Sequence, residues 1–320
     1  MNYYLVLIFT TILISTLMYY YLHKKTGIRK KYMYDDNIVV ILSTIIISIA
    51  ITKTIIPFEY LWHSLMITIA LVGIIGFGIT MIRFWRKPRR KVNRDPNKIV
   101  SPADGNIIYI KKIDKGELPI SVKNKKISKL HELTKTELLK TPCWLVGINM
   151  TPFDVHRNCS PISGEITFQK HTPGSFLSLK SPESESENER NTFVIENDKL
   201  QVGVVQIASK LVRAISTYKK TGVQVEKGDW IGMIRFGSQV DVILPINYNI
   251  NISLKEQIYA GKTILAEYNY ANINWYRPSR PCTPFQKFCK RNAKERPQHS
   301  FHLPAKGIWE RIIRSRRVQI

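Results

Sequence analysis

The sequence predicts a mainly β (α+β) soluble domain behind an N-terminal helical transmembrane anchor. Three observations support this fold class. Apolar runs with few charges fill the first 83 residues, short alternating segments separated by turn residues fill the middle, and a segment rich in Arg and Pro follows residue 270. We therefore divide the 320 residues into an anchor (1–83), a soluble domain (84–270) and a basic tail of unknown role (271–320).

The anchor contains three apolar runs, at residues 3–22, 38–56 and 61–82. Each has about the 20 residues that a helix needs to cross a bilayer. Buried core helices are the alternative, and the small number of charges disfavours it. Lys53 lies in the second run, so two spans are the alternative to three. The first run lacks the basic start and the cleavage site of a signal peptide, so we expect it to stay attached.

The basic residues around these runs predict the topology. Lys and Arg are frequent in residues 23–34 and 83–91, whereas the link at 57–60 has none. Loops rich in Lys and Arg stay in the cytoplasm. We therefore expect a multi-pass protein of the cell membrane with a cytoplasmic soluble domain.

The net charge of +24 raises the alternative of a nucleic-acid-binding membrane protein. Much of the positive charge lies beside the apolar runs, where basic residues bind anionic headgroups. Residues 271–320 carry twelve Lys or Arg against two Glu, without a recognisable nucleic-acid motif. A membrane surface and an anionic phospholipid therefore explain the charge better than a nucleic acid does.

Cysteines in a cytoplasmic domain are expected to be free thiols, and the chain has four: Cys143, Cys159, Cys282 and Cys289. The last two could be grouped with His299 and His302 as zinc ligands. Their spacing fits no common zinc finger, so we expect no metal site.

The soluble domain contains many short segments with the β-branched, alternating pattern of strands. They lie at residues 106–113, 143–150, 165–170, 191–196, 202–209, 212–218, 231–236 and 240–244. Residues 127–139 are a helical candidate, and 181–190 read as a loop. Gly237 and Ser238 separate the last two strand segments. By itself such a pair indicates a bulge or a tight turn.

Six motifs in order carry a resemblance to a known family: Phe84-Trp-Arg-Lys-Pro-Arg-Arg90, Ser101-Pro-Ala-Asp-Gly105, Asp154-Val-His-Arg157 with Pro161, Pro173-Gly174, Asn188-Glu-Arg190 and Phe236-Gly-Ser238. Each motif alone is weakly specific. In this order and spacing, they make residues 83–266 resemble the phosphatidylserine decarboxylases, particularly their short archaeal-type form.

The resemblance implies a pyruvoyl-dependent enzyme that cleaves itself between Gly237 and Ser238. The Ser238 hydroxyl would attack the preceding carbonyl, and elimination would leave a covalent pyruvoyl group, while the two chains stay associated. The pyruvoyl ketone would form a Schiff base with the amine of a serine phospholipid and draw electrons from the breaking carboxylate bond. The product would be an ethanolamine phospholipid, with either ester- or ether-linked tails.

The resemblance also implies that Asp104 and His156 join Ser238 as the catalytic residues. A histidine titrates near neutral pH, and a carboxylate can hold its tautomer. Taken alone, Asp104 would read as a turn residue and His156 as an ordinary loop histidine.

Four further residues receive substrate-binding or loop-orienting roles. Asp154 is expected to orient the loop that carries His156. Pro173 and Gly174 are expected to line the headgroup pocket, with an ordinary turn as the alternative. Arg190 could bind phosphate or carboxylate as a bidentate donor, or could form a structural pair with Glu189 or another acid.

Two departures from the family pattern qualify these roles. Cys159 stands where many long-form bacterial enzymes carry a second histidine that is implicated in self-cleavage. Either His156 would serve both steps, or Cys159 or another group helps. Gln239 stands where relatives carry a hydroxyl or a positive charge. An inactive, non-cleaving lipid-binding relative is therefore the alternative to the enzyme. A homo-oligomer is compatible with either.

Overall fold

The computed structural model describes residues 3–54, 61–114, 117–119, 127–129, 134, 136–137, 139–174, 188–208, 214–235 and 238–268. The described helices and strands belong to one compact unit, Met1–Asn272. The predicted tail after residue 270 and the cysteine–histidine group near its centre lie outside the described residues.

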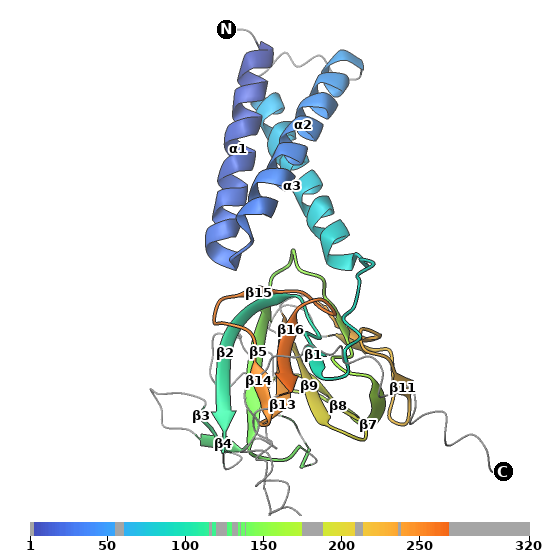
Figure 1. The fold of residues 1–320 in the computed structure, drawn as a ribbon. Helices are drawn as coiled ribbons and strands as arrows, with labels where there is room; N and C mark the ends of the chain where they lie inside the picture. Colours follow the sequence, from blue (N-terminus) through green and yellow to red (C-terminus); the bar gives the residue numbers. More distant parts are fainter. Residues whose placement is uncertain are drawn as a thin grey trace, which may run out of the picture. The chain divides into compact units, whose positions relative to one another are not determined.

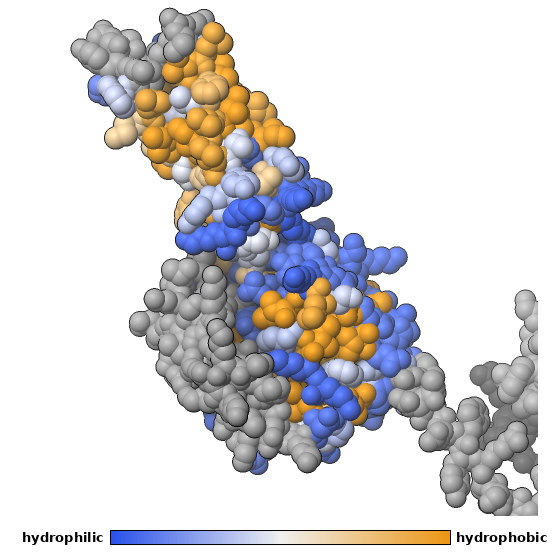
Figure 2. Space-filling view, turned by 90° about the vertical axis from the view of Figure 1, so that its left-hand side faces the viewer, coloured by the Kyte–Doolittle hydropathy of each residue, from blue (hydrophilic) through white to orange (hydrophobic). Residues whose placement is uncertain are grey.

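Each of the three apolar runs forms a helix, as predicted: α1 (Tyr3–Thr26), α2 (Lys30–Thr54) and α3 (Leu61–Trp85) (Figure 1). All three are long and apolar enough to cross a membrane. Gly27, with a φ of 71°, follows the end of α1, where a left-handed residue commonly terminates a helix. Figure 2 shows apolar residues covering the visible flank of the helices, with a hydrophilic band below them. Such a flank is compatible with lipid contact.

A small core holds the three helices together. Tyr19, Val40 and Val72 are buried, one from each helix. Near its end, α3 also bonds to α2, because Arg83 donates from Nε to Asp36 Oδ2 at 2.6 Å. This ion pair holds the C-terminal end of α3 against α2, next to the segment that connects α3 to the sheet domain.

The remainder of the described chain is mostly sheet, as predicted. The strands are β1 (Lys98–Val100), β2 (Gly105–Ile113), β3 (Glu117–Pro119), β4 (Ile127–Lys129), β5 (Cys143–Met150), β6 (Arg157–Cys159), β7 (Gly164–Thr172), β8 (Arg190–Glu196), β9 (Gln201–Ala208), β10 (Ile215–Thr217), β11 (Gln224–Val225), β12 (Trp230–Ile234), β13 (Ser238–Pro245), β14 (Tyr248–Ile250), β15 (Gln257–Ile258) and β16 (Ile264–Tyr268).

The largest sheet has the order β11-β7-β8-β9-β13-β5-β2-β15 and is curled around the core (Figure 1). Smaller sheets have the orders β1-β16-β14, β10-β12-β6 and β3-β4. Strand β13 lies in the middle of the large sheet, and its apolar side chains Val240, Val242 and Leu244 are fully buried in the main core. A strand with neighbours on both sides and buried side chains is held rigidly.

The helical candidate at residues 127–139 was wrong at its start, because Ile127–Lys129 form β4 and pair antiparallel with β3. A short helix is costly to nucleate without a packing partner. Pairing with β3 instead satisfies backbone groups of residues 127–129 without a helix nucleus, so the β3–β4 ladder is favoured.

Gly237 lies outside the described residues, and the strands on either side of it belong to different sheets. Strand β12 belongs to the sheet β10-β12-β6, whereas β13 belongs to the large sheet. The chain therefore passes from one sheet to another between residues 234 and 238. Ser238 is the first residue of β13, where it pairs with Met150 of β5 and Ala208 of β9.

Candidate active site

The loop between β5 and β6 carries His156, and hydrogen bonds to Asp154 fix the shape of this loop. Oδ2 of Asp154 accepts hydrogen bonds from the backbone N of Thr151 at 2.9 Å and from the Thr151 hydroxyl at 2.7 Å. Arg29 lies in the turn between α1 and α2, and its Nη2 donates a hydrogen bond to Asp154 Oδ1 at 3.1 Å. Asp154 thus joins the loop to the helices, as a loop-orienting residue would.

The imidazole of His156 is fully buried. Its Nδ1 lies 2.9 Å from the backbone O of Asp154. A carbonyl oxygen only accepts, so Nδ1 must carry a proton, and in the neutral imidazole Nε2 then presents a lone pair. Nε2 is buried and has no hydrogen-bond partner among the described residues. This is the tautomer that a general base requires.

The surroundings keep this imidazole neutral. Burial lowers the pKa of His156 from 6.5 to about 4, against the hydrogen bond to Asp154 and the charge of Asp104, which raise it. Phe84, the penultimate residue of α3, stacks on the imidazole with ring centroids 4.0 Å apart. At neutral pH, Nε2 is therefore free to take a proton.

The backbone brings His156 close in the fold to the predicted cleavage site. The backbone N of Ile234, at the end of β12, donates to the backbone O of His156 at 3.1 Å. Four residues later, Ser238 begins β13 opposite Met150, the last residue of β5. The loop that carries His156 starts directly after Met150. Ile234 and Ser238, on either side of the predicted cleavage site, therefore both lie beside the segment 150–156.

Asp104 makes contacts other than those we expected. It is fully buried and forms a two-pronged ion pair with Arg90, in which Nη2 donates to Oδ2 at 2.7 Å. The backbone N of Ala260 donates to Oδ1 at 2.8 Å. The hydrogen bond that fixes the His156 tautomer therefore comes from Asp154, while Asp104 acts on the imidazole through its charge. The catalytic role of Asp104 stays a prediction.

Cys159 and Gln239, the two departures from the family pattern, are both buried. Burial raises the pKa of the Cys159 thiol to about 12, and Sγ lies 3.5 Å from the backbone O of Ser101, to which it can donate. A protonated thiol is a poor base and a poor nucleophile. Gln239 donates from Nε2 to Asp241 Oδ1 and to the Tyr109 hydroxyl, each at 2.9 Å.

Arg190 lies on β8 and is fully buried. Its Nε and Nη2 donate to the backbone O of Asn188 at 3.0 and 2.9 Å. Burial lowers the pKa of this guanidinium to about 10, although the charge of Asp241 raises it. The headgroup-binding role of Arg190 stays a prediction. Glu189, which we considered as its acidic partner, instead pairs with His171 at 2.7 Å.

Pro173 and Gly174 follow β7 directly, and Pro173 is exposed. At the end of β7, Thr172 pairs with Arg190. No described contact joins Pro173 or Gly174 to His156. Their headgroup-lining role stays a prediction.

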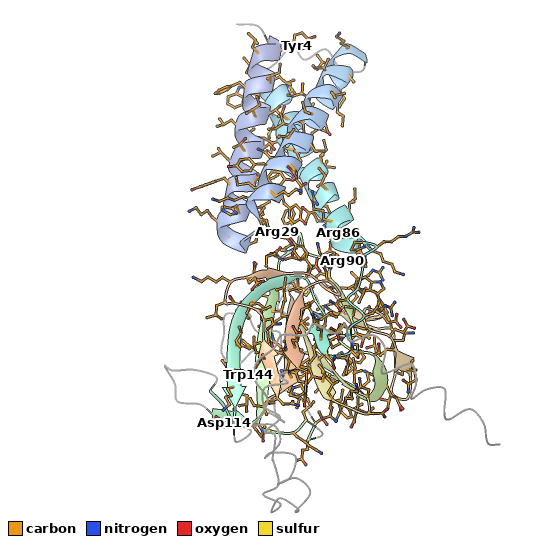
Figure 3. The ribbon with its side chains drawn as sticks, viewed as in Figure 1. Tyr4, Arg29, Arg86, Arg90, Asp114 and Trp144 are labelled. Atoms are coloured by element: carbon orange, nitrogen blue, oxygen red, sulfur yellow. The ribbon has the colours of Figure 1, made fainter. Side chains whose placement is uncertain are left out.

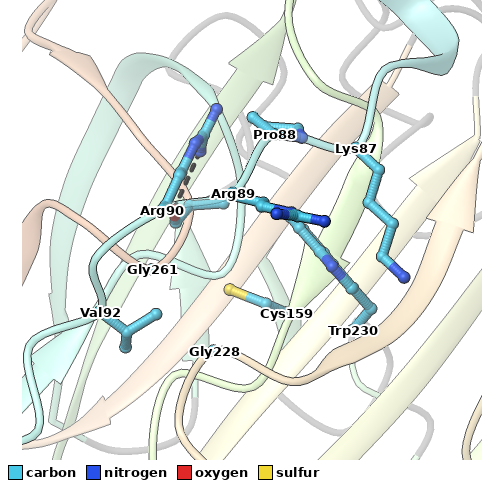
Figure 4. Close-up of a pocket in the computed structure, with 10 residues that line it drawn as sticks. Lys87, Pro88, Arg89, Arg90, Val92, Cys159, Gly228, Trp230 and Gly261 are labelled. Atoms are coloured by element: carbon cyan, nitrogen blue, oxygen red, sulfur yellow. Dashed lines mark hydrogen bonds between the residues drawn. The ribbon is translucent and has the colours of Figure 1, made fainter.

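A pocket of about 530 Å³ opens beside the segment that follows α3 (Figure 4). Its lining residues are Lys87, Pro88, Arg89, Arg90, Val92, Cys159, Gly228, Trp230, Ala260 and Gly261. Neither His156 nor Asp104 is among these lining residues. The described residues contain no group of three or more His, Cys, Asp or Glu that could hold a metal ion.

Sequence reasoning missed three residues that position this site: Phe84, Arg29 and Arg90. Phe84 and Arg90 belong to the first of the six motifs, but no role was predicted for either residue. Figure 3 shows Arg29, Arg86 and Arg90 between the helices and the strands. A basic motif gives no signal of which carboxylate each arginine meets.

Comparisons with known proteins agree with the resemblance. The family model described as phosphatidylserine decarboxylase matches residues 77–266. A Methanocaldococcus jannaschii protein carrying the name archaetidylserine decarboxylase proenzyme is 40% identical over 195 residues, which cover 61% of this chain and 93% of that protein. A phosphatidylserine decarboxylase proenzyme of Amoebophilus asiaticus is 37% identical, over 59% of this chain and 76% of its own. A phosphatidylserine decarboxylase proenzyme of Burkholderia ambifaria is 32% identical, over 66% of this chain and 92% of its own length.

The comparisons define the class first: the chain is a decarboxylase, and therefore an enzyme of the carboxy-lyase class. More particularly, it belongs to the phosphatidylserine decarboxylase family, because the match covers more than half of its residues.

Proposed function

We propose that this chain is a membrane-anchored, pyruvoyl-dependent decarboxylase. It converts phosphatidylserine or archaetidylserine into the ethanolamine phospholipid with release of CO2. The observation that carries the proposal is the buried, neutral His156, whose unprotonated Nε2 has no hydrogen-bond partner among the described residues. The names of the relatives supply the substrate class.

His156 serves first in self-cleavage. Its Nε2 takes the proton of the Ser238 hydroxyl, whose oxygen attacks the carbonyl of Gly237. The peptide bond is replaced by an ester, and the freed nitrogen becomes the amine of Ser238. Elimination then expels the Gly237 carboxylate, and hydrolysis with loss of ammonia leaves a pyruvoyl group at the head of β13. A serine hydroxyl needs such a base, because it is a weak nucleophile by itself.

The residues at this position fit a pyruvoyl group. Ser238 heads a central strand, and the unpartnered Nε2 of His156 lies on the loop that follows its partner strand β5. A bound pyruvoyl group supplies an electron sink for decarboxylation. His156 is left to hold or move the proton that the product requires.

The sheet explains why the two cleavage chains should stay associated. Strand β13 would belong to the C-terminal chain, yet both of its neighbours, β5 and β9, belong to the N-terminal chain. Strands β15 and β16 likewise pair with β2 and β1 from the N-terminal side. Cleavage would therefore leave the two chains joined by several strand ladders.

The same proposal covers the domains and the localisation. Residues 1–83 anchor the enzyme in the cell membrane, residues 84–270 form the catalytic domain in the cytoplasm, and residues 271–320 are a basic tail of unknown role. The membrane and an anionic phospholipid are the partners, and a homo-oligomer is compatible with the fold. Three apolar helices with basic residues at one boundary support this arrangement.

The test is CO2 release from serine lipids labelled at the carboxyl carbon, in nanodiscs that contain either the ester-linked or the ether-linked form. The wild type should release CO2 from at least one form, and Ser238→Ala should release none. A protein that stays uncleaved and releases no CO2 would instead be the inactive lipid-binding relative.

A further inference from the structure

Arg86, the first residue after α3, has an unpartnered buried donor. Its Nη1 is buried and makes no hydrogen bond to any described residue. Its Nη2 makes one long contact, 3.4 Å from the Tyr32 hydroxyl. A guanidinium has five N–H donors, and a buried donor without a partner is unfavourable unless a ligand completes it.

Three nearby arginines each form an ion pair with a carboxylate, although Nε of Arg29 is also buried without a hydrogen-bond partner among the described residues. Arg29 pairs with Asp154, Arg83 with Asp36 and Arg90 with Asp104. Among the described residues, Arg86 has no ion-pair partner. Its guanidinium carbon instead lies 5.8 Å from the centre of the Tyr32 ring, which Arg29 and Arg83 also approach. An anion would balance this concentration of positive charge.

Arg86 also lies near the proposed base. It follows Phe84 by two residues, and Phe84 stacks on His156. Burial is the main cause of the low pKa of His156, and the charge of Arg86 lowers it further. Nη1 of Arg86 and Nε2 of His156 are thus two unpartnered buried polar atoms in the same part of the domain. A ligand bound by Arg86 would therefore lie in the part of the domain that holds the proposed base.

A serine phospholipid offers two anionic groups to Arg86, its carboxylate and its phosphate. A salt bridge to the carboxylate would be lost as CO2 departs, so it would stabilise the substrate more than the transition state. The phosphate keeps its charge throughout the reaction, and a guanidinium matches phosphate geometry with paired donors. The position of Arg86 at the end of α3 also places it where headgroups would lie if α3 spans the membrane.

We propose that Arg86 binds the phosphate of the serine headgroup and so holds that headgroup beside His156. This inference rests on the proposed function for the identity of the lipid. The headgroup is the source of the phosphate, in preference to free phosphate, because the donor lies at the boundary between α3 and the catalytic domain (Figure 3).

The test is a binding measurement on full-length protein in nanodiscs made of a neutral lipid. Ser238→Ala serves as the background, because it keeps the uncleaved state and makes binding independent of catalysis. The probes are glycerophosphoserine, O-methylserine and inorganic phosphate, measured by calorimetry. The variants added to this background are Arg86→Gln and the matched Arg89→Gln, which removes the same charge from an exposed arginine three residues away.

Arg86→Gln should weaken glycerophosphoserine binding about tenfold or more, since a charge-assisted contact is lost. O-methylserine, which lacks phosphate, should bind equally to both proteins. Arg89→Gln should leave all three affinities within about twofold. Inorganic phosphate alone should bind more weakly than glycerophosphoserine.

Three results would overturn the inference. They are unchanged glycerophosphoserine binding in Arg86→Gln, equal weakening in Arg89→Gln, and inorganic phosphate binding as tightly as glycerophosphoserine. If thermal unfolding shows that Arg86→Gln is misfolded, Arg86→Lys replaces it, and a weakening specific to glycerophosphoserine is again required. Failure of the wild type to release CO2 would contradict the proposed function alone, because binding is measured in the uncleaved protein.

Discussion

The buried imidazole of His156 makes the pH dependence of self-cleavage a sharp test of its role. With a pKa of about 4, His156 should be almost entirely in its neutral form at pH 5.5. We therefore expect the wild-type cleavage rate to change less than about twofold between pH 8 and pH 5.5. An imidazole with its ordinary pKa of 6.5 would be only about one-tenth neutral at pH 5.5.

Phe84→Ala should replace the nearly flat pH dependence of the wild type with that of an imidazole whose pKa is ordinary. Phe84 is fully buried and stacks on the imidazole, so truncating it opens a space through which water can reach the ring. The pKa should then rise towards 6.5, and the cleavage rate should fall about tenfold between pH 8 and pH 5.5. Phe84→Leu keeps an apolar cover and should resemble the wild type.

The assay starts from uncleaved protein made by cell-free synthesis into nanodiscs and then moved to buffers of different pH. The cleaved fraction is followed with time on a denaturing gel. Phe84→Ala should also lower the free energy of unfolding by about 3 kcal/mol or more, so thermal unfolding must show that it is folded at each pH.

The titration of His156 also changes the free energy of unfolding with pH, and this effect must be distinguished from the change in cleavage rate. The folded-state pKa of His156 lies below its unfolded value of 6.5, so the unfolded chain binds the extra proton as the pH falls from 6.5 to about 4. In that window the wild type loses about 1.4 kcal/mol of stability per pH unit, and above it this contribution is complete. The reasoning is refuted if the wild-type rate already falls near pH 6.5, or if folded Phe84→Ala keeps the wild-type pH profile.

Three further predictions concern neighbouring groups and the membrane. Asp104→Asn removes one partner of a buried ion pair with Arg90 and should lower the free energy of unfolding by about 3 kcal/mol, with slower cleavage; unchanged thermal unfolding would contradict the pairing. Cys159→Ser should cleave at nearly the wild-type rate, and a block of cleavage in this variant would assign the base role to the thiol. In the wild type, the Cys159 thiol should resist maleimide labelling at pH 7, because its pKa is about 12. Protease added outside sealed cells should leave the catalytic domain intact, and its digestion would reverse the proposed topology.

Local patterns were sufficient for much of the fold. Each apolar run in the first 83 residues became a helix, because length and lack of charge decide that outcome with little help from distant residues. Alternating β-branched segments likewise became strands. The segment at 127–129 failed because its ladder with β3, at residues 117–119, outweighed a weak helical pattern.

The site was only partly predictable, because its contacts join residues that lie far apart in the sequence. The motifs indicated Asp104 and His156, but the stack of Phe84 on His156 joins residues 72 positions apart, since 156 − 84 = 72. The pairing of Asp104 with Arg90 depends on how the segment after α3 folds back on the sheet. The burial of Arg190 depends on the strand order around β8. Sequence spacing alone reports none of these contacts.

The most direct test of the central claim is the intact mass of the wild-type protein purified in mild detergent. Cleavage before Ser238 predicts an N-terminal chain of 237 residues and a C-terminal chain of 83, since 320 − 237 = 83. The smaller chain should be lighter by one ammonia than a simple hydrolysis fragment, because a pyruvoyl group replaces its first residue. Both chains should elute together, while Ser238→Ala should remain a single chain of 320 residues. A wild-type protein with the mass of the full chain, or a C-terminal chain that begins with an unmodified serine, would contradict the account.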